Sequence, residues 1–143
     1  MTPKQGLRIS RILQFMKYLG IDYGTKRVGI ALSDERGSIA FPHSVLQNDD
    51  SLLPALAMLI EREQVMKIAI GDTRASGGAE NVITPNVEAF AIALRKRGVS
   101  VTLVPELLSS FEAGRYVRAS GQSDASAAAI ILQRYLDGLR TKT

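Results

Sequence analysis

The sequence predicts an α/β protein with a mixed five-stranded sheet flanked by helices, and two observations lead to this fold class. The first is a series of three apolar segments joined by short turns, because short connections join antiparallel strands. The second is the strand–helix–strand–helix–strand pattern that follows, because such crossovers join parallel strands. Three antiparallel strands and two parallel ones would then form one sheet. A chain of 143 residues, 45% of them hydrophobic, is long enough to bury one core.

The first two strands are predicted to form a hairpin in the segment KYLGIDYGTKRVGIALSD, residues 17–34. Apolar side chains alternate up to Ile21, the pattern breaks over residues 24–27, and alternation resumes at Val28. Asp22 stands just before the break, on the opposite strand face from Ile21. A carboxylate at the end of an apolar strand is poorly solvated unless a cation such as a metal ion compensates it. The alternative is a turn-forming aspartate, which is common in hairpins.

The third strand is expected over residues 38–46, where Pro42 favours an irregular or edge position. A helix-start cluster at residues 48–51 precedes a helical stripe of leucines. The later elements are expected in this order: a strand over residues 65–70, a helix from Pro85 to Gly98, a strand over residues 99–104, a helix from Ser109 to about Ala119, and a helix that opens at Asp124.

Composition narrows the classes of function. The chain has no cysteine, which excludes a disulfide framework and a thiolate metal site and suits a reducing, cytoplasmic compartment. Its single histidine, His43, excludes a histidine-rich metal centre and most histidine-dependent triads. No apolar run approaches the ~20 residues of a membrane span, so no membrane partner is expected. The net charge of +4 favours anionic partners, nucleic acid first.

Three carboxylates stand at the ends of elements that such a sheet brings together. Asp22 ends the first strand, Glu106 follows the fifth, and Asp124 opens the last helix, although a plain helix N-cap also explains Asp124. Carboxylates ~4 Å apart repel each other by about 4 kcal/mol per pair at an effective dielectric near 20. A divalent cation removes this conflict, and oxygen-only ligands favour Mg²⁺ or Mn²⁺ over zinc. Such a centre hydrolyses phosphodiester bonds without a protein nucleophile.

The segment GIDYGTKRVGIALSD closely resembles the first-hairpin signature of the YqgF/RuvX family. These small RNase H-like proteins are named as Holliday junction resolvases and as nucleases for the precursor of 16S ribosomal RNA. The resemblance extends over most of the chain from Met16, and the last helix, DASAAAIILQRYLD, also matches the family pattern. It implies an RNase H-like fold, with Asp22, Glu106 and Asp124 as the catalytic and metal-binding residues.

Two motifs depart from the family pattern. After the fifth strand the family usually has Asp-Glu-Arg, whereas this chain has Pro-Glu-Leu at residues 105–107, so that only Glu106 is retained. After the fourth strand the family usually has Gly-Leu-Pro, and this chain has Gly-Asp-Thr at residues 71–73. Asp72 therefore offers a further carboxylate near the predicted metal site, with a solvated loop residue as the alternative.

Three basic residues are the predicted contacts to nucleic-acid phosphates: Lys26, Arg27 and Arg74. Each such contact steepens the salt dependence of binding by about one unit of slope. Residues 1–15 are also basic and contain no acidic residue, and we expect a flexible extension that precedes a single domain over residues 16–143. An RNA-contacting tail and a transit peptide are the alternatives for the extension.

The resemblance and the three acids together predict an endonuclease that depends on Mg²⁺ or Mn²⁺. Its expected substrate is structured RNA, chiefly the 5′ end of the 16S rRNA precursor, with branched DNA as a second class and ribosomal precursor particles as partners. A monomer and a homodimer are both compatible, and resolvase-type cleavage calls for the dimer. The altered motif at residues 105–107 motivates an alternative, a non-catalytic nucleic-acid-binding or ribosome-associated protein. An ATPase phosphate loop at residues 22–25 is the weakest interpretation, because the chain is too short for the second domain such folds need.

Overall fold

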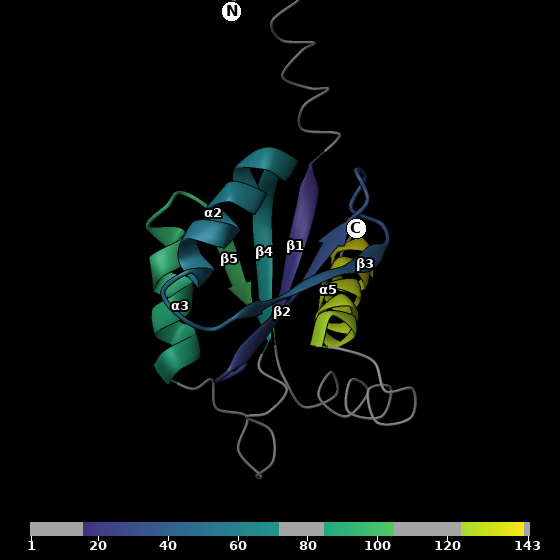
Figure 1. Cartoon of the computed structure of the whole chain (residues 1–143). Coiled ribbons are helices and arrows are strands. Elements are labelled where there is room, and N and C mark those ends of the chain that lie inside the picture. The colour runs from purple at the N-terminus through teal and green to yellow at the C-terminus, as the bar shows by residue number, and fades with distance from the viewer. Residues whose placement is uncertain (1–15, 72–84, 105–123, 142–143) are drawn as a thin grey trace, which may run out of the picture.

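The computed structural model describes residues 16–71, 85–104 and 124–141. Within these ranges the elements are β1 (Lys17–Asp22), β2 (Arg27–Ser33), β3 (Ala40–Gln47), α2 (Leu52–Glu63), β4 (Val65–Gly71), α3 (Pro85–Arg95), β5 (Ser100–Leu103) and α5 (Asp124–Thr141). The strands form one sheet in the order β3-β2-β1-β4-β5 (Figure 1). The β1–β2 and β2–β3 pairs are antiparallel, whereas β1–β4 and β4–β5 are parallel. This arrangement confirms the predicted mixed five-stranded sheet.

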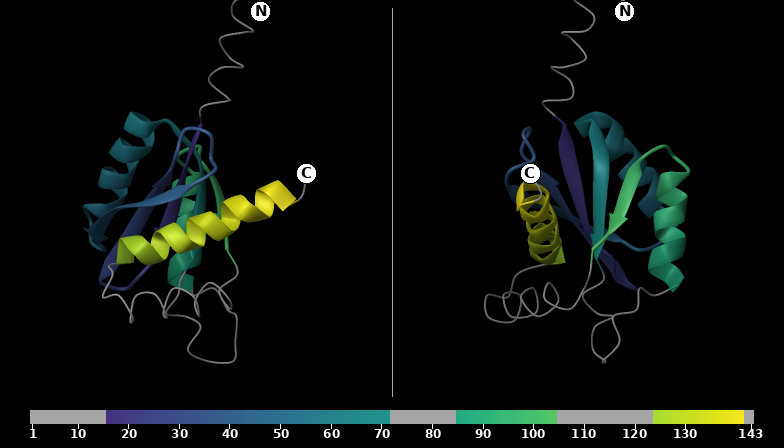
Figure 2. Two further views of the ribbon diagram at one scale, coloured as in Figure 1. Left: turned by 90° about the vertical axis from the view of Figure 1, so that its right-hand side faces the viewer. Right: turned by 180° about the vertical axis from the view of Figure 1, so that it is seen from behind.

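Helices α2 and α3 cover one face of the sheet and α5 covers the other (Figures 1 and 2). The core beneath α2 and α3 includes Leu19 and Ile21, two side chains that alternate along β1. The core beneath α5 combines small sheet residues, such as Ala31 and Ala69, with large helix residues such as Leu132. Small side chains on the sheet allow α5 to lie close to it. None of the helices in the described ranges is long and apolar enough to cross a membrane.

Strand β3 lies at the edge of the sheet, as Pro42 indicated. The register with β2 shifts between Ile30 and Ala31, whose partners are Ser44 and Pro42, so that His43 is passed over. Proline has no amide hydrogen to donate to a ladder, and sheets tolerate it at edges and at bulges. The strand begins two residues later and ends one residue later than predicted.

Two glycines allow the backbone of α5 to rest directly on the sheet. A Cβ atom built at Gly29 of β2 would lie 2.0 Å from the carbonyl oxygen of Asp124, and one built at Gly20 of β1 would lie 2.5 Å from the Cβ of Leu132. The obstacle at Gly29 is backbone, which cannot move aside as a flexible side chain does. The beginning of α5 is therefore fixed over β2, beside the carboxyl end of β1.

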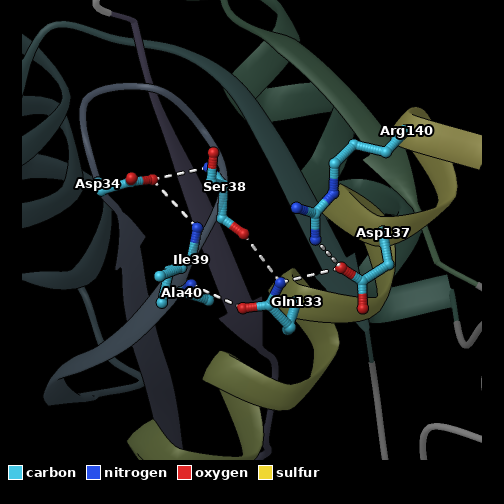
Figure 3. A network of polar contacts seen from close by, with 7 residues as sticks. All are labelled: Asp34, Ser38, Ile39, Ala40, Gln133, Asp137 and Arg140. Carbon is cyan, nitrogen blue, oxygen red and sulfur yellow. Dashed lines mark hydrogen bonds and ion pairs between the residues drawn. The ribbon is translucent and has the colours of Figure 1, made fainter. Parts of the chain in front are cut away.

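The connection between β2 and β3 is tied to α5 by polar contacts (Figure 3). The carboxylate of Asp34 accepts hydrogen bonds from the backbone N–H groups of Ser38 and Ile39, at 2.7 and 3.1 Å. Burial acts to raise the pKa of Asp34, but these hydrogen bonds hold it below the ordinary value. The Gln133 side chain of α5 accepts the N–H of Ala40 at 2.9 Å and donates to the carbonyl of Ser38 at 3.0 Å. These bonds fix the rotation of α5 about its own axis.

Helix α2 begins directly after the helix-start cluster at residues 48–51, as predicted. Ser51 occupies the N-cap position without a side-chain hydrogen bond to the first turn. Its N–H and hydroxyl donate instead to the carboxylate of Asp49. The expected helix over residues 109–119 and the extension over residues 1–15 lie outside the described residues. Those two assignments, and the single-domain assignment, stay predictions.

Candidate functional site

The parallel strands β1, β4 and β5 end at the same edge of the sheet, at the lower end of the molecule in Figure 1. We call this the carboxyl edge. Strand β2, which is antiparallel to β1, begins at this edge with Arg27, and α5 begins there with Asp124. Asp22, the last residue of β1, lies at the same edge. Two of the three predicted acids and two of the three predicted phosphate contacts, Lys26 and Arg27, thus lie at one edge of the sheet.

Asp22 is buried, with only 2% of its surface exposed. Its cross-strand partners are Gly29 of β2 and Gly71 of β4, so neither neighbour carries a side chain beside it. Asp22 shares a strand face with Gly20, and a Cβ built at Gly20 points at α5. The Asp22 carboxylate therefore leaves the strand on the α5 face, where water is largely excluded. Such a group requires compensation by a cation or by hydrogen-bond donors.

The start of α5 lies within reach of Asp22. Opposed residues of an antiparallel pair have Cβ atoms about 4.5–5.5 Å apart, and the Cβ position of Gly29 is 2.0 Å from the Asp124 carbonyl oxygen, so the Asp22 Cβ lies within roughly 7–8 Å of that oxygen. The side chain of Asp22 therefore leaves its strand close to the backbone of Asp124. In the first turn of α5, the Asp124 carboxylate also stabilises the positive end of the helix dipole.

Arg27 forms an ion pair with Asp124. Its Nε lies 3.2 Å from Oδ2 of Asp124, and the Arg27 and Asp124 side chains are 63% and 23% exposed. Arg27 is two residues from Gly29 on β2, so the two share the strand face that meets α5. The residue predicted to contact phosphate is thus paired with a predicted metal ligand. Nothing in the sequence pattern indicated this contact.

The turn between β1 and β2 is held from outside the hairpin by Asn48. Its backbone N–H donates to the carbonyl of Lys26 at 2.9 Å, and its side-chain amide donates to the carbonyl of Gly24 at 2.6 Å. On the other side of the turn, the Tyr23 ring stacks on Phe90 of α3, with centroids 4.9 Å apart and planes 12° apart. The sequence assigned Asn48 only to the helix-start cluster. Its local pattern does not show whether such an asparagine caps the next helix or bonds to a turn far away in the sequence.

The other predicted site residues, Glu106, Arg74 and Asp72, lie outside the described residues. The ladder between β4 and β5 continues to the hydrogen bond from the Val104 N–H to the Ile70 carbonyl, 2.8 Å long, two positions before Glu106 in the sequence. Within the described ranges no three acidic, histidine or cysteine residues gather into a potential metal cluster. The proposed set of three metal ligands therefore stays a prediction.

The two acids that the structure places are suited to a hard divalent cation. Both offer only carboxylate oxygens, which Mg²⁺ and Mn²⁺ prefer as ligands. Asp22 is buried, and both of its cross-strand neighbours are glycines, so no side chain from β2 or β4 occupies the position opposite it. Asp22 and Asp124 would supply the first ligands of such an ion.

Solved structures show which class of fold this is. The chain matches the structure of Thermus thermophilus RuvC with a TM-score of 0.55, covering 88% of this chain and 97% of that one at 15% identity. T. thermophilus RuvC in complex with a Holliday junction substrate matches with a TM-score of 0.54, covering 87% and 96% at 15% identity. At these identities the likeness establishes the fold alone. It is the RNase H-like fold of RuvC.

Sequence comparisons identify the family. The family model described as "RuvX: Holliday junction resolvase" matches residues 16–138. A protein of Oleidesulfovibrio alaskensis is 41% identical over 133 residues, which cover 85% of this chain and 92% of the relative. A protein of Bordetella petrii is 36% identical over 124 residues, covering 85% and 95%. Both are named "Putative pre-16S rRNA nuclease". This chain belongs to the RuvX family, which confirms the resemblance seen in its first hairpin.

Proposed function

We propose that this protein is a divalent-metal-dependent endonuclease that hydrolyses phosphodiester bonds in structured nucleic acid, with the precursor of 16S rRNA as its main substrate. The observation that carries the proposal is the buried Asp22 at the carboxyl edge, beside the beginning of the helix that carries Asp124. Family membership and the names of the relatives support the same activity. Four-way DNA junctions are the second substrate class, because the family description names them.

Each placed residue has a task that its surroundings support. Asp22 and Asp124 are the proposed metal ligands, with Glu106 as the third. The fold holds Asp22 and Asp124 rigidly, since Asp22 lies between two paired strands and α5 is seated on glycine. Lys26 and Arg27, both exposed at the start of β2, are the proposed phosphate contacts. Arg74 is proposed for the same role from its position in the sequence.

The reaction consumes one water, whose oxygen forms a bond to phosphorus while the bond from phosphorus to the 3′-oxygen breaks. A bound Mg²⁺ or Mn²⁺ supplies Lewis acidity and neutralises negative charge on the reacting phosphate. The carboxylates of Asp22 and Asp124 would fix the position of the cation beside the reacting phosphate. Exposed cations at the β1–β2 turn attract and orient the backbone of the substrate, because phosphate contacts set the register of a nucleic acid on a protein.

The decisive experiment incubates the protein with a 16S rRNA fragment that carries its 5′ extension, and separately with a four-way DNA junction, with and without Mg²⁺. We expect metal-dependent cleavage, faster on the RNA, and a loss of at least about a hundredfold in Asp22→Asn. The control is Glu35→Gln, which removes an exposed acid from the β2–β3 turn, at the opposite end of the sheet from the carboxyl edge. RNA binding without metal-dependent cleavage would favour the non-catalytic alternative. Cleavage by Asp22→Asn at the wild-type rate would refute the assigned site.

A further inference from the structure

We propose that Arg27 exchanges partners during the catalytic cycle. It pairs with Asp124 when no divalent cation is bound, and it turns to a backbone phosphate of the nucleic acid once a cation occupies the carboxylates. The inference rests on the proposed function and deepens it, because it couples metal binding to substrate capture at one side chain. It also explains why Arg27, a proposed phosphate contact, forms an ion pair with the acidic Asp124.

The geometry of the pair is suited to such an exchange. The 3.2 Å contact joins Nε of Arg27 to Oδ2 of Asp124, and 63% of the Arg27 side chain is exposed. Ion pairs this exposed contribute little, because water screens them and two flexible side chains must be ordered. A divalent cation carries twice the charge of the guanidinium and accepts ligands from several carboxylates at once. Occupation of the site by the cation therefore displaces the weaker partner.

The backbone around Arg27 stays in place during the exchange. Arg27 pairs with Gln47 of β3, and the preceding turn is held by the two hydrogen bonds from Asn48 to Gly24 and Lys26. Only the long side chain has to turn, and most of it lies in solvent. A guanidinium released at this place stands at the carboxyl edge, where the substrate phosphate must come to meet the two acids.

The first test measures Mn²⁺ binding by calorimetry in the absence of nucleic acid. Removing the competing cation in Arg27→Gln should tighten Mn²⁺ binding by about two- to fivefold. The control is Lys26→Gln, which makes the same change in charge on the neighbouring residue without removing the ion pair, and should have a smaller effect. Equal affinities in the two variants, or weaker binding in Arg27→Gln, would overturn the exchange and make Arg27 a fixed support for Asp124.

The second test needs neither metal nor cleavage. Binding of the 16S precursor fragment is measured against salt concentration in EDTA for the wild type, Asp124→Asn, Arg27→Gln and the double variant. Asp124→Asn removes the acidic partner of Arg27, so it should steepen the salt dependence by about one unit of slope, and the steepening should vanish when Arg27 is also replaced. An equal effect of Asp124→Asn in both backgrounds would reflect general charge alone and would contradict the proposal.

A third variant separates the failure of the exchange from a failure of the proposed function. If Mn²⁺ binding survives unchanged in Asp22→Asn, the ion is bound elsewhere, and both the metal site and the exchange are wrong. If Asp22→Asn abolishes binding while Arg27→Gln behaves like Lys26→Gln, the metal site stands and only the exchange is refuted.

Discussion

Replacing Gly29 by alanine tests how α5 is seated on the sheet. The added Cβ would lie 2.0 Å from the carbonyl oxygen of Asp124 and 3.0 Å from the backbone nitrogen of Ala125. Real Cβ contacts do not come below 3.0 Å, so the oxygen must retreat by about 1 Å. Because both obstacles are backbone atoms, the whole first turn of α5 has to shift.

The magnitude follows from this shift. Overpacking of a close-packed contact costs about 1–3 kcal/mol. At an unfolding entropy of about 2.1 cal/mol/K per residue, a chain of 143 residues loses roughly 3–10 °C in Tm. A displacement of ~1 Å at a catalytic group lowers the rate by about a hundredfold. We therefore expect Gly29→Ala to remain folded at 25 °C and to lose most of its cleavage activity.

Thermal unfolding and metal-dependent RNA cleavage are the two measurements, and Gly138→Ala is the matched control. Gly138 lies within α5, and a Cβ built there meets nothing within 4 Å. Alanine in a helix is more stable than glycine by roughly 0.5–1 kcal/mol, so Gly138→Ala should raise the Tm and leave cleavage intact. A Gly29→Ala protein as stable and as active as the wild type would show that α5 does not rest on Gly29.

Two further predictions concern the hydrogen bonds around the sheet. Asn48→Leu removes the side-chain bond to the Gly24 carbonyl, and should lower the free energy of unfolding by about 1 kcal/mol in urea and weaken RNA binding, because the turn that carries Lys26 loosens. A 2.6 Å hydrogen bond from Lys17 lowers the pKa of Glu63 in the folded protein. This contact therefore stabilises the fold fully above the ordinary carboxyl pKa of about 4.3, and the stabilisation is lost as the pH falls through the lower pKa of the folded state. Glu63→Gln should therefore lower the free energy of unfolding at pH 7 by no more than about 1 kcal/mol, and its difference from the wild type should shrink as the pH falls below the ordinary carboxyl pKa. A difference that does not change with pH would contradict the assignment.

The fold could be predicted because its evidence is local. Alternating apolar residues define the strands, and the lengths of their connections decide which neighbours are antiparallel or parallel. Pro42 also predicted the edge position of β3 correctly, since a central strand needs the amide hydrogen that proline lacks. The sequence located the start of α2 but not the hydrogen bonds from Ser51 to Asp49, because several polar side chains in a row offer alternative acceptors and the backbone geometry selects among them.

The candidate site was predicted in part. Asp22 and Asp124 stand at element ends, so a sheet topology is enough to place them at one edge. The pairing of Arg27 with Asp124 could not be predicted, because the contact depends on where α5 begins over β2. That position depends on Gly29, and from the sequence alone a glycine in a strand indicates only that the strand is weakened there.

Bound Mn²⁺ can be located by its paramagnetic broadening of amide signals in a two-dimensional NMR spectrum, and this measurement probes the metal site without relying on cleavage. The two-carboxylate site predicts the strongest broadening at Asp22, Gly29 and Ala125, which surround the carboxyl edge. Amides at Gly37, in the β2–β3 turn, and at Gly138, near the end of α5, should keep their signals. Broadening that is uniform, or that is strongest at Gly37 or Gly138, would contradict the claim that this edge holds the metal.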